Sequence, residues 1–398
     1  MRENILFITK DALCKSYLPC YGNKMWRDKT PNLDYLAQNG TVFKKHYTAA
    51  PSKVMYFRAM MTGKYPFEQP YSDYSPKEVD EGDFDFFSIA ASRGYQGHIV
   101  WDKTWDHMVL RYGNCFGSKT TIHSLDGIKQ GVGCHYNHSD RIVDNDETAN
   151  KTIELIFAEI QQIVSNSTPV VVWMHLPHVL NGRSSYGGDI DIFDKLIGKL
   201  RTLFNDNNIF ISADHGNMNG YDGKYCYGFD VNTSSIEIPL ITPRINGMAT
   251  CDSLTSNVDI KTIIFDRKIN AREVVFSETA YYAQPHRKIA IRKDSFLYVF
   301  SKEKSKEELY DVENDSFCRV NLLKNSFYDP DRRVKTPVKD YYYSPYWDNA
   351  HLISCEFRDI KNKIWINAPK HIELKNKILR RVKFFLVKFK RNKQQRGQ

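Results

Sequence analysis

Acidic and imidazole side chains follow three apolar runs of the sequence, each about as long as a buried β-strand. They are Asp11 after Asn4–Thr9 (NILFIT), His178 after Pro169–Met174 (PVVVWM), and the pair Asp214 and His215 after Asn208–Ser212 (NIFIS). A carboxylate and an imidazole at adjacent positions can both bind one divalent cation, and a carboxylate from another strand end could complete the site. Asp11, Asp214 and His215 are therefore candidate metal ligands, although an Asp in such a place is more often a helix cap or turn residue.

The elements that would position these residues alternate between strand and helix. Besides the three runs above, they are a predicted strand at Gly97–Trp101 and predicted helices opening at Pro31 and covering Phe84–Arg93, Asp146–Val164 and Asp191–Phe204. This alternation predicts an α/β fold of three layers, in which helices cover both faces of a mostly parallel sheet. Ligands of such sheets bind at the carboxyl ends of the strands, so we expect the predicted site residues to converge there.

The pattern changes after about residue 265. Short alternating runs such as VVFSE, KIAIRK and SFLYVFS predict a small antiparallel C-terminal subdomain at residues 266–325, beside a catalytic α/β domain at residues 1–265. Residues 326–369 are rich in Tyr, Asp and Pro and have no clear period, so we predict an irregular extension there. Residues 370–398 form a basic tail.

The tail accounts for the basicity of the chain. It carries 11 Lys and Arg against one acid, Glu373, whereas the formal net charge of all 398 residues is +9. A basic tail on a nearly neutral fold argues against a nucleic-acid-binding surface. Within residues 375–393, Ile378, Val382, Phe385, Leu386 and Phe389 recur at helical spacing. A basic amphipathic helix of this kind suits an anionic membrane surface, and the alternatives are a solvated tail or a helix docked on the protein's own core.

Sequence features that would direct the chain across or out of a membrane are missing. No 18 apolar residues run together, and Asp11 closes the N-terminal apolar run before any small-residue cleavage site. We therefore expect a cytoplasmic protein, which the tail would hold peripherally at the inner membrane face. The eight cysteines have no paired spacing and are predicted to be free thiols.

An ordered set of motifs over residues 4–323 resembles the sulfatase family of the alkaline-phosphatase-like superfamily, including its phosphotransferase relatives. The motifs are Asp11–Gly22 (DALCKSYLPCYG), Thr30–Phe43 (TPNLDYLAQNGTVF), Tyr47–Pro66 (YTAAPSKVMYFRAMMTGKYP), His175–His178 (HLPH), Ser212–Lys224 (SADHGNMNGYDGK), Glu237–Leu240 (EIPL) and Glu308–Leu323 (ELYDVENDSFCRVNLL). The resemblance implies one divalent cation (Ca, Mn, Mg or Zn) on Asp11, Asp214 and His215. It also implies that His178 and Lys224 hold the ester's oxyanion and assist the leaving group.

The nucleophile position departs from the family pattern. The family places a Cys, Ser or Thr nine residues before its Thr-Gly, and this chain has Lys53 at that distance from Thr62. The Cys-x-Pro-Ser-Arg motif is also missing, which excludes conversion of a Cys to formylglycine at this spot. Ser52 is the adjacent hydroxyl and the candidate catalytic nucleophile, but it is equally well placed to cap the following helix. The alternatives are a water activated by the cation, or a loss of catalysis.

Three functions are consistent with this sequence. The first is metal-dependent hydrolysis of a sulfate or phosphate ester, of a glycan or of a small molecule. The second is transfer of a phosphoryl-linked group onto a surface or lipid-linked glycan, which Ala12 favours because many sulfatases have a second Asp at that position. The third is a non-catalytic binding protein that retains the fold, which Lys53 favours.

Overall fold

The structure is a computed structural model of the chain. It describes residues 3–24, 28–68, 86–106, 120–126, 128, 146–166, 168–177, 190–218, 227–228, 230–279, 288–301, 306–324, 326–329, 334–337, 344–346 and 349–365. Three predictions lie outside these residues, namely the roles of His178 and Lys224 and the amphipathic helix of the tail at 370–398.

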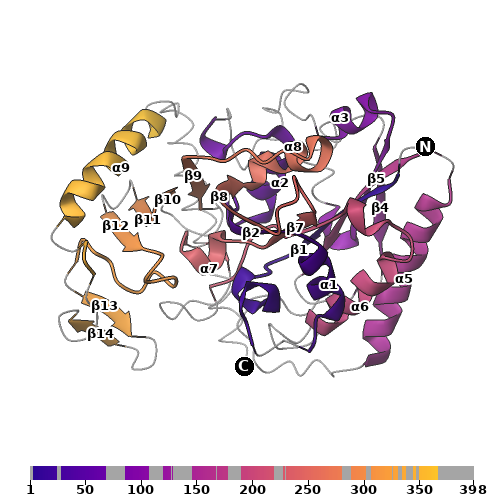
Figure 1. The fold of residues 1–398 in the computed structure, drawn as a ribbon, viewed down its shortest axis with the longest axis horizontal. Helices are drawn as coiled ribbons and strands as arrows, with labels where there is room; N and C mark the ends of the chain where they lie inside the picture. Colours follow the sequence, from indigo (N-terminus) through magenta and orange to yellow (C-terminus); the bar gives the residue numbers. More distant parts are fainter. Residues whose placement is uncertain are drawn as a thin grey trace, which may run out of the picture.

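An eight-stranded sheet forms the centre of the larger part of the fold (Figure 1). In spatial order its strands are β4 (Thr120–Leu125), β3 (Gln96–Asp102), β5 (Val170–Leu176), β1 (Ile5–Lys10), β6 (Ile209–Ala213), β7 (Leu240–Pro243), β2 (Gly40–Tyr47) and β8 (Thr250–Ser256). All neighbouring pairs are parallel except those that β7 makes with β6 and β2. This arrangement confirms the predicted mostly parallel sheet.

Helices cover both faces of this sheet. They are α1 (Pro31–Asn39), α5 (Asp146–Val164) and α6 (Ile190–Leu200) in one group, α2 (Lys53–Thr62), α3 (Phe86–Ser92) and α8 (Ile260–Asp266) in a second, and the short α7 (Thr233–Ile236). In Figure 1, α1 and α6 lie below the sheet and α5 at its right-hand side, whereas α3 and α8 lie above it. Strands β1, β5 and β6 are buried along their whole length because they lie between these layers. The largest apolar core of the described residues forms on the two faces.

A second, antiparallel sheet packs beside the first. Its strands are β12 (Lys306–Asp311), β11 (Phe296–Ser301), β10 (Lys288–Lys293) and β9 (Val274–Glu278), and β9 contacts β8 and β2 of the main sheet. The fold class predicted from the sequence included this small antiparallel subdomain, and the structure confirms it.

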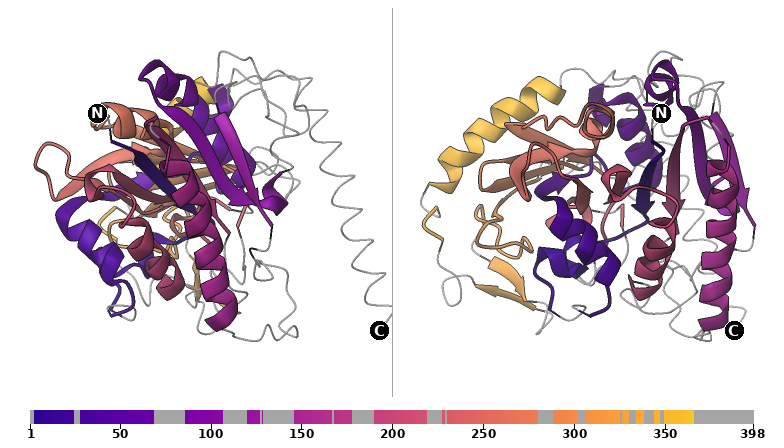
Figure 2. Two further views of the ribbon diagram at one scale, coloured as in Figure 1. Left: turned by 90° about the vertical axis from the view of Figure 1, so that its right-hand side faces the viewer. Right: turned by 45° about the vertical axis from the view of Figure 1, so that its right-hand side comes forward.

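The segment that follows is more regular than the sequence suggests. It contains a hairpin of β13 (Ser326–Asp329) and β14 (Val334–Pro337), then the helix α9 (Ala350–Trp365), which lies along the four-stranded sheet (Figure 2). Phe357 of α9 stacks on Tyr298, with ring centroids 5.6 Å apart, and Arg358 pairs with Glu307 at 2.7 Å. The prediction of an irregular extension at 326–369 was therefore wrong for α9, whose apolar stripe forms part of a core with this sheet.

Two expectations about whole-chain features can be compared with the described residues. None of the helices in the described ranges is long and apolar enough to span a bilayer. The cysteines within those ranges, Cys14, Cys20, Cys251, Cys318 and Cys355, are free thiols.

Candidate metal centre

Turns at the carboxyl ends of two neighbouring strands bring Asp11 and Asp214 together. Strands β1 and β6 are parallel and paired up to their last residues, Lys10 and Ala213, so the next residue of each strand reaches the same edge of the sheet. The backbone N–H of Ala12 donates to Asp214 Oδ1 at 2.9 Å. Ala12 has a φ of 57°, which is uncommon for a residue with a Cβ and indicates a turn held by its surroundings.

Buried contacts fix the two turns to each other. The N–H of Asn217 donates to Cys14 Sγ at 3.1 Å, and the Cys14 thiol donates to the carbonyl of Ser234 at 3.3 Å. A Cβ on Gly216 would lie 1.9 Å from that same carbonyl oxygen, so only glycine allows this close approach. The backbone at Gly216 therefore packs directly against the backbone of Ser234, and this contact holds His215 and Asn217 in place.

The imidazole of His215 has one tautomer in this setting. Its Nδ1 lies 2.9 Å from the carbonyl oxygen of Gly216, which can only accept, so Nδ1 carries the proton. Burial lowers the pKa of His215 to about 4, so the ring is neutral at pH 7. The lone pair of Nε2 therefore points into the site, where it lies 3.4 Å from Asp214 Oδ2 and 3.6 Å from Asp11 Oδ1.

His175 is a fourth member of the site that the sequence did not single out. It is the last residue but one of β5, fully buried, and its Nε2 lies 4.0 Å from Asp214 Oδ2. Its Nδ1 is 2.8 Å from the hydroxyl of Thr9, which leaves Nε2 as a cation ligand when Nδ1 donates this hydrogen bond. Burial lowers the pKa of His175 well below its usual value.

Together these groups form a set of electron-pair donors suited to a divalent cation. One ligand atom from each of Asp11, His175 and Asp214 lies within 4.8 Å of the others, and all three side chains are buried. Within the described part of the chain, Asp214 Oδ2, His175 Nε2 and His215 Nε2 have no hydrogen-bond partner. Burial, and next the charge of Asp11, raise the pKa of Asp214 well above its usual value. A cation would satisfy the unpaired atoms and relieve the repulsion between the two acids.

Lys53 brings a positive charge to the same place. It is the first residue of α2, and its ammonium forms an ion pair with Asp11 Oδ2. The ammonium lies 4.1 Å from the ring centroid of Trp105 and 5.9 Å from that of Tyr227. The same Trp105 ring packs on His175 with centroids 4.0 Å apart, so Lys53 lies directly beside the candidate ligands.

Comparison with known proteins identifies the family. The model of the sulfatase family matches residues 3–260, which is more than half of the chain. The chain belongs to the sulfatase family. A segment of 74 residues is 38% identical to human steryl-sulfatase, and it covers 19% of this chain and 12% of that protein. A segment of 63 residues is 44% identical to mouse steryl-sulfatase, with 16% and 10% covered. The matched segments thus span about a tenth of these curated relatives.

Solved structures of sulfatase relatives share the fold. A 2-O GAG sulfatase has a TM-score of 0.64 at 15% identity, over 94% of this chain and 96% of the other. The phosphonate monoester hydrolase of Agrobacterium radiobacter has a TM-score of 0.63 at 15% identity, over 91% of this chain and 96% of the other. At this identity the likeness concerns the arrangement of the backbone alone.

The two residues at which the chain departs from the family pattern, Ser52 and Lys53, lie at the start of α2. Lys53, which the resemblance placed where the family pattern has its nucleophile, contacts Asp11. Ser52 is at the N-cap of α2, fully buried, but its side chain forms no capping hydrogen bond, and its Oγ has no partner among the described residues. The cap that was the alternative for Ser52 is therefore not formed. The structure thus brings Asp11, Asp214 and His215 together, and it adds His175 and Lys53 to them.

Proposed function

We propose that this chain is a metal-dependent hydrolase of sulfate or phosphate esters. The observation that carries the proposal is the meeting of two buried carboxylates with two neutral imidazoles, whose unpaired Nε2 atoms both lie within 4.0 Å of Asp214 Oδ2. Such a cluster is unfavourable without a cation, because acceptor atoms face one another in a buried place. The expected metal ligands are Asp11, His175, Asp214 and His215.

Residues around the candidate metal centre have separate proposed roles in ester hydrolysis. The cation, when bound, supplies positive charge that stabilises negative charge growing on the ester's oxygens. The Lys53 ammonium adds a second positive charge beside it and orients the anionic group of the ester. Trp105 forms an apolar wall against both Lys53 and His175, which keeps water from weakening these interactions. We propose that Ser52 Oγ bonds to the sulfur or phosphorus as the bond to the substrate's alcohol oxygen breaks, and that the alcohol gains a proton to replace the one Ser52 loses. Water then cleaves the Ser52 ester, which releases sulfate or phosphate and restores the hydroxyl. His178 and Lys224 would assist at the oxyanion and the leaving group.

The substrate class is proposed from the relatives. The structural neighbours include a 2-O GAG sulfatase and a phosphonate monoester hydrolase, and the sequence relatives include steryl-sulfatases. We therefore propose a sulfated or phosphorylated glycan as substrate, with small-molecule esters as assay substrates. The ion pair of Lys53 with Asp11 favours a second candidate, a non-catalytic protein that binds an anion at the same centre.

A screen of esters tests the proposal. The full chain is incubated with 4-nitrophenyl sulfate, 4-nitrophenyl phosphate and a phosphonate monoester, each with added Ca, Mn, Mg or Zn. The Asp214→Asn variant should lose both the turnover and the bound metal, measured by elemental analysis. Asp259→Asn is the matched control, because Asp259 is also buried but pairs with Arg272 at 2.7 Å away from the candidate ligands. Metal content unchanged in Asp214→Asn would reject the metal site, and metal binding without turnover would favour the binding protein.

A further inference from the structure

One buried side chain, Asn257, joins the chain before α2 to the first turns of that helix. Asn257 begins the short 3₁₀ helix Asn257–Asp259, which connects β8 to α8 and packs on α2. Its Oδ1 accepts from the backbone N–H of Ala49 at 2.7 Å, and its Nδ2 donates to the backbone carbonyl of Tyr56 at 3.2 Å. Ala49 comes before Ser52 in the sequence and Tyr56 comes after it, so the amide bridges the chain across Ser52.

The orientation of the Asn257 amide is determined by its two partners. A backbone N–H can only donate and a carbonyl can only accept, so the amide oxygen must face Ala49 and the amide nitrogen must face Tyr56. Asn257 and Ala49 are fully buried, so loss of the side chain would leave the N–H of Ala49 without a partner in a dry place. The amide is therefore a rigid connection between the loop and the helix.

The loop before α2 has a second attachment, to the antiparallel sheet. Ser277 Oγ donates to the carbonyl of Thr48 at 2.8 Å, and the backbone N–H of Glu278 donates to the carbonyl of Ala49 at 2.9 Å. Both donors belong to β9. The N–H and the carbonyl of Ala49 thus bond to two different segments, which leaves this part of the loop little freedom to move.

Ser52 and Lys53 lie in the stretch that these hydrogen bonds enclose. Ser52 is the N-cap of α2, and its carbonyl accepts from the N–H of Tyr56 at 2.9 Å. Lys53 is the first residue of the helix, and its ammonium pairs with Asp11 Oδ2. The position at which α2 begins therefore decides whether the ammonium reaches Asp11, and the amide of Asn257 fixes that position.

We propose that Asn257 is a positioning residue for the candidate metal centre, because its amide fixes the start of α2 and thereby holds Lys53 at Asp11 and Ser52 in place. The consequence for Ser52 rests on the proposed ester hydrolysis. The hold on Lys53 is independent of that reaction, since the ion pair forms in the folded chain without a substrate. A misplacement of about 1 Å can slow a reaction about a hundredfold, so even a small movement of Ser52 should be measurable as lost turnover.

A double-mutant cycle between Asn257 and Lys53 tests the proposal on the full chain. Leucine has the same branched shape as asparagine, so Asn257→Leu removes both hydrogen bonds with little change of shape, and Lys53→Met removes the ammonium. The effect of Lys53→Met is measured in the wild type and in Asn257→Leu, by calorimetric titration with Mn and by urea unfolding in EDTA. Because residues of one hydrogen-bonded network do not act additively, Lys53→Met should change the Mn affinity at least about threefold less in the Asn257→Leu background. The loss of stability that Lys53→Met causes should likewise be smaller there.

Turnover supplies a readout that a purely structural role would leave unchanged. In Asn257→Leu, kcat on 4-nitrophenyl sulfate or phosphate should fall about 10–100-fold, whereas KM should change less. The reason is that the attacking hydroxyl of Ser52 moves, while Asp214 and His215 keep their places after β6.

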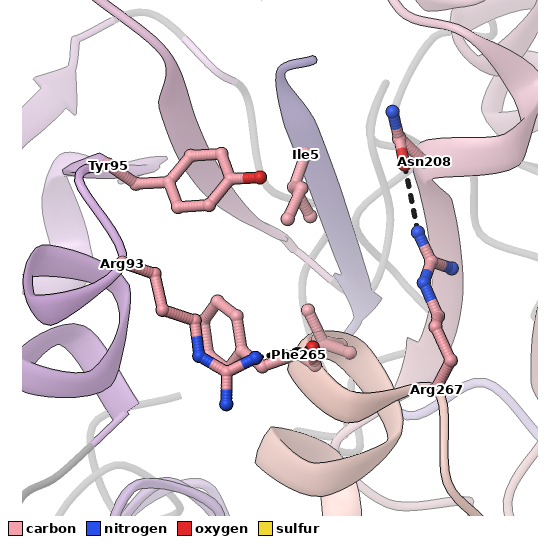
Figure 3. A pocket seen from close by; sticks show the side chains of 7 residues that line it. Ile5, Arg93, Tyr95, Asn208, Phe265 and Arg267 are labelled. Carbon is pink, nitrogen blue, oxygen red and sulfur yellow. Dashed lines mark hydrogen bonds between the residues drawn. The ribbon is translucent and has the colours of Figure 1, made fainter. Parts of the chain in front are cut away.

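Two asparagines serve as matched controls. Asn321 is also buried, and its Oδ1 accepts from two backbone N–H groups of the C-terminal subdomain, at 3.1 and 3.0 Å. Asn208 precedes β6, at the opposite end of this strand from Asp214, and its Oδ1 accepts from Arg267 at 2.8 Å beside a cavity (Figure 3). Asn321→Leu and Asn208→Leu should leave kcat and the effect of Lys53→Met nearly unchanged.

Two results would overturn the proposal. Equal effects of Lys53→Met in the two backgrounds would show that Asn257 does not hold Lys53, and a loss of kcat no larger than in the controls would show that it does not position Ser52. If the wild type hydrolyses no ester or binds no cation, the proposed function fails, and the urea cycle still decides the role of Asn257 because it requires neither. Should Asn257→Leu fail to fold, Asn257→Ser leaves room for a water at the N–H of Ala49 and takes its place, with the same expected results.

Discussion

Replacement of Lys53 by methionine should make the metal centre bind divalent cations more tightly. The Lys53 ammonium and a cation compete for the same carboxylate, since Lys53 forms an ion pair with Asp11. The side chain of Lys53 is 20% exposed and that of Asp11 is 3% exposed, so solvent screens this pair only weakly. Methionine keeps an unbranched apolar stem against Trp105 and removes the charge.

The size of the effect follows from the energy of the pair that the cation must displace. Two unit charges 4 Å apart interact by about 4 kcal/mol at an effective dielectric constant of 20, and desolvation and side-chain entropy offset part of this. Net values for hydrogen bonds to charged groups are about 1.5–3 kcal/mol. Because about 1.4 kcal/mol corresponds to a factor of ten, Lys53→Met should bind the cation about 10–100-fold more tightly.

Calorimetric titration with Mn, Mg, Ca and Zn measures this directly, and thermal unfolding gives a second readout. Without metal, the variant should unfold at a lower temperature than the wild type, because Asp11 and Asp214 lose their counter-charge, and added cation should stabilise it more. Lys15→Met is the matched control, since Lys15 is also 20% exposed and pairs with Glu237 at 2.6 Å. If Lys53→Met binds cations no more tightly than wild type and Lys15→Met, Lys53 does not compete for Asp11.

Three further predictions concern other parts of the chain. Ser52→Ala should abolish ester turnover while leaving cation affinity and urea stability nearly unchanged, because Ser52 Oγ has no hydrogen-bond partner among the described residues; full activity would assign the attack to another group. Burial lowers the pKa of His46 to about 3, so the unfolded chain takes up this proton below about pH 6.5 and the folded chain does not. Stability should therefore fall as the pH drops from about 6.5 to 3, with a slope of at most about 1.4 kcal/mol per pH unit from this residue. Urea unfolding of His46→Gln at pH 7 and pH 5 should lack this component, and an equal pH dependence in both proteins would contradict it. The full chain should sediment with anionic liposomes at low salt and a chain ending at Pro369 should not, because each basic residue near the surface contributes about 1 kcal/mol; equal binding by both would leave the tail without this role.

Much of the fold follows from local patterns in the sequence. The apolar runs that became β1, β3, β5 and β6 are buried on both faces, so they lack polar interruptions and stand out as strands. Strands β2 and β8 were not predicted, because Lys44, Lys45 and Asp252 interrupt their apolar residues and their pairing joins distant segments. Helix α9 was missed because its apolar stripe lies within a segment whose composition suggested irregular structure.

The site residues could be predicted where they directly follow a strand-like apolar run, and less well elsewhere. Asp11, Asp214 and His215 follow apolar runs directly, and parallel pairing then brings them to one edge. His175 also follows an apolar run directly, Pro169–Met174, but a single histidine there is as easily a buried core residue, and the prediction chose His178 instead. Its register opposite Thr9 on β1 supplies the missing signal, and that register is known only from the folded sheet. The contact of Lys53 with Asp11 likewise depends on where α2 begins relative to β1.

Lys53 changes the charge of the candidate metal centre. Without a cation, the ion pair of Lys53 with Asp11 is neutral overall, and burial favours a proton on Asp214. A divalent cation is bound by ionised carboxylates, so its charge opposes the rise in the pKa of Asp214 that burial causes. With both carboxylates ionised, the cation and the Lys53 ammonium together leave a net positive charge in a buried place. The net charge of these groups is then +1, so a singly charged sulfate ester neutralises it, whereas a doubly charged phosphate monoester leaves one negative charge. By this count we expect Lys53 to favour a singly charged ester over a doubly charged one.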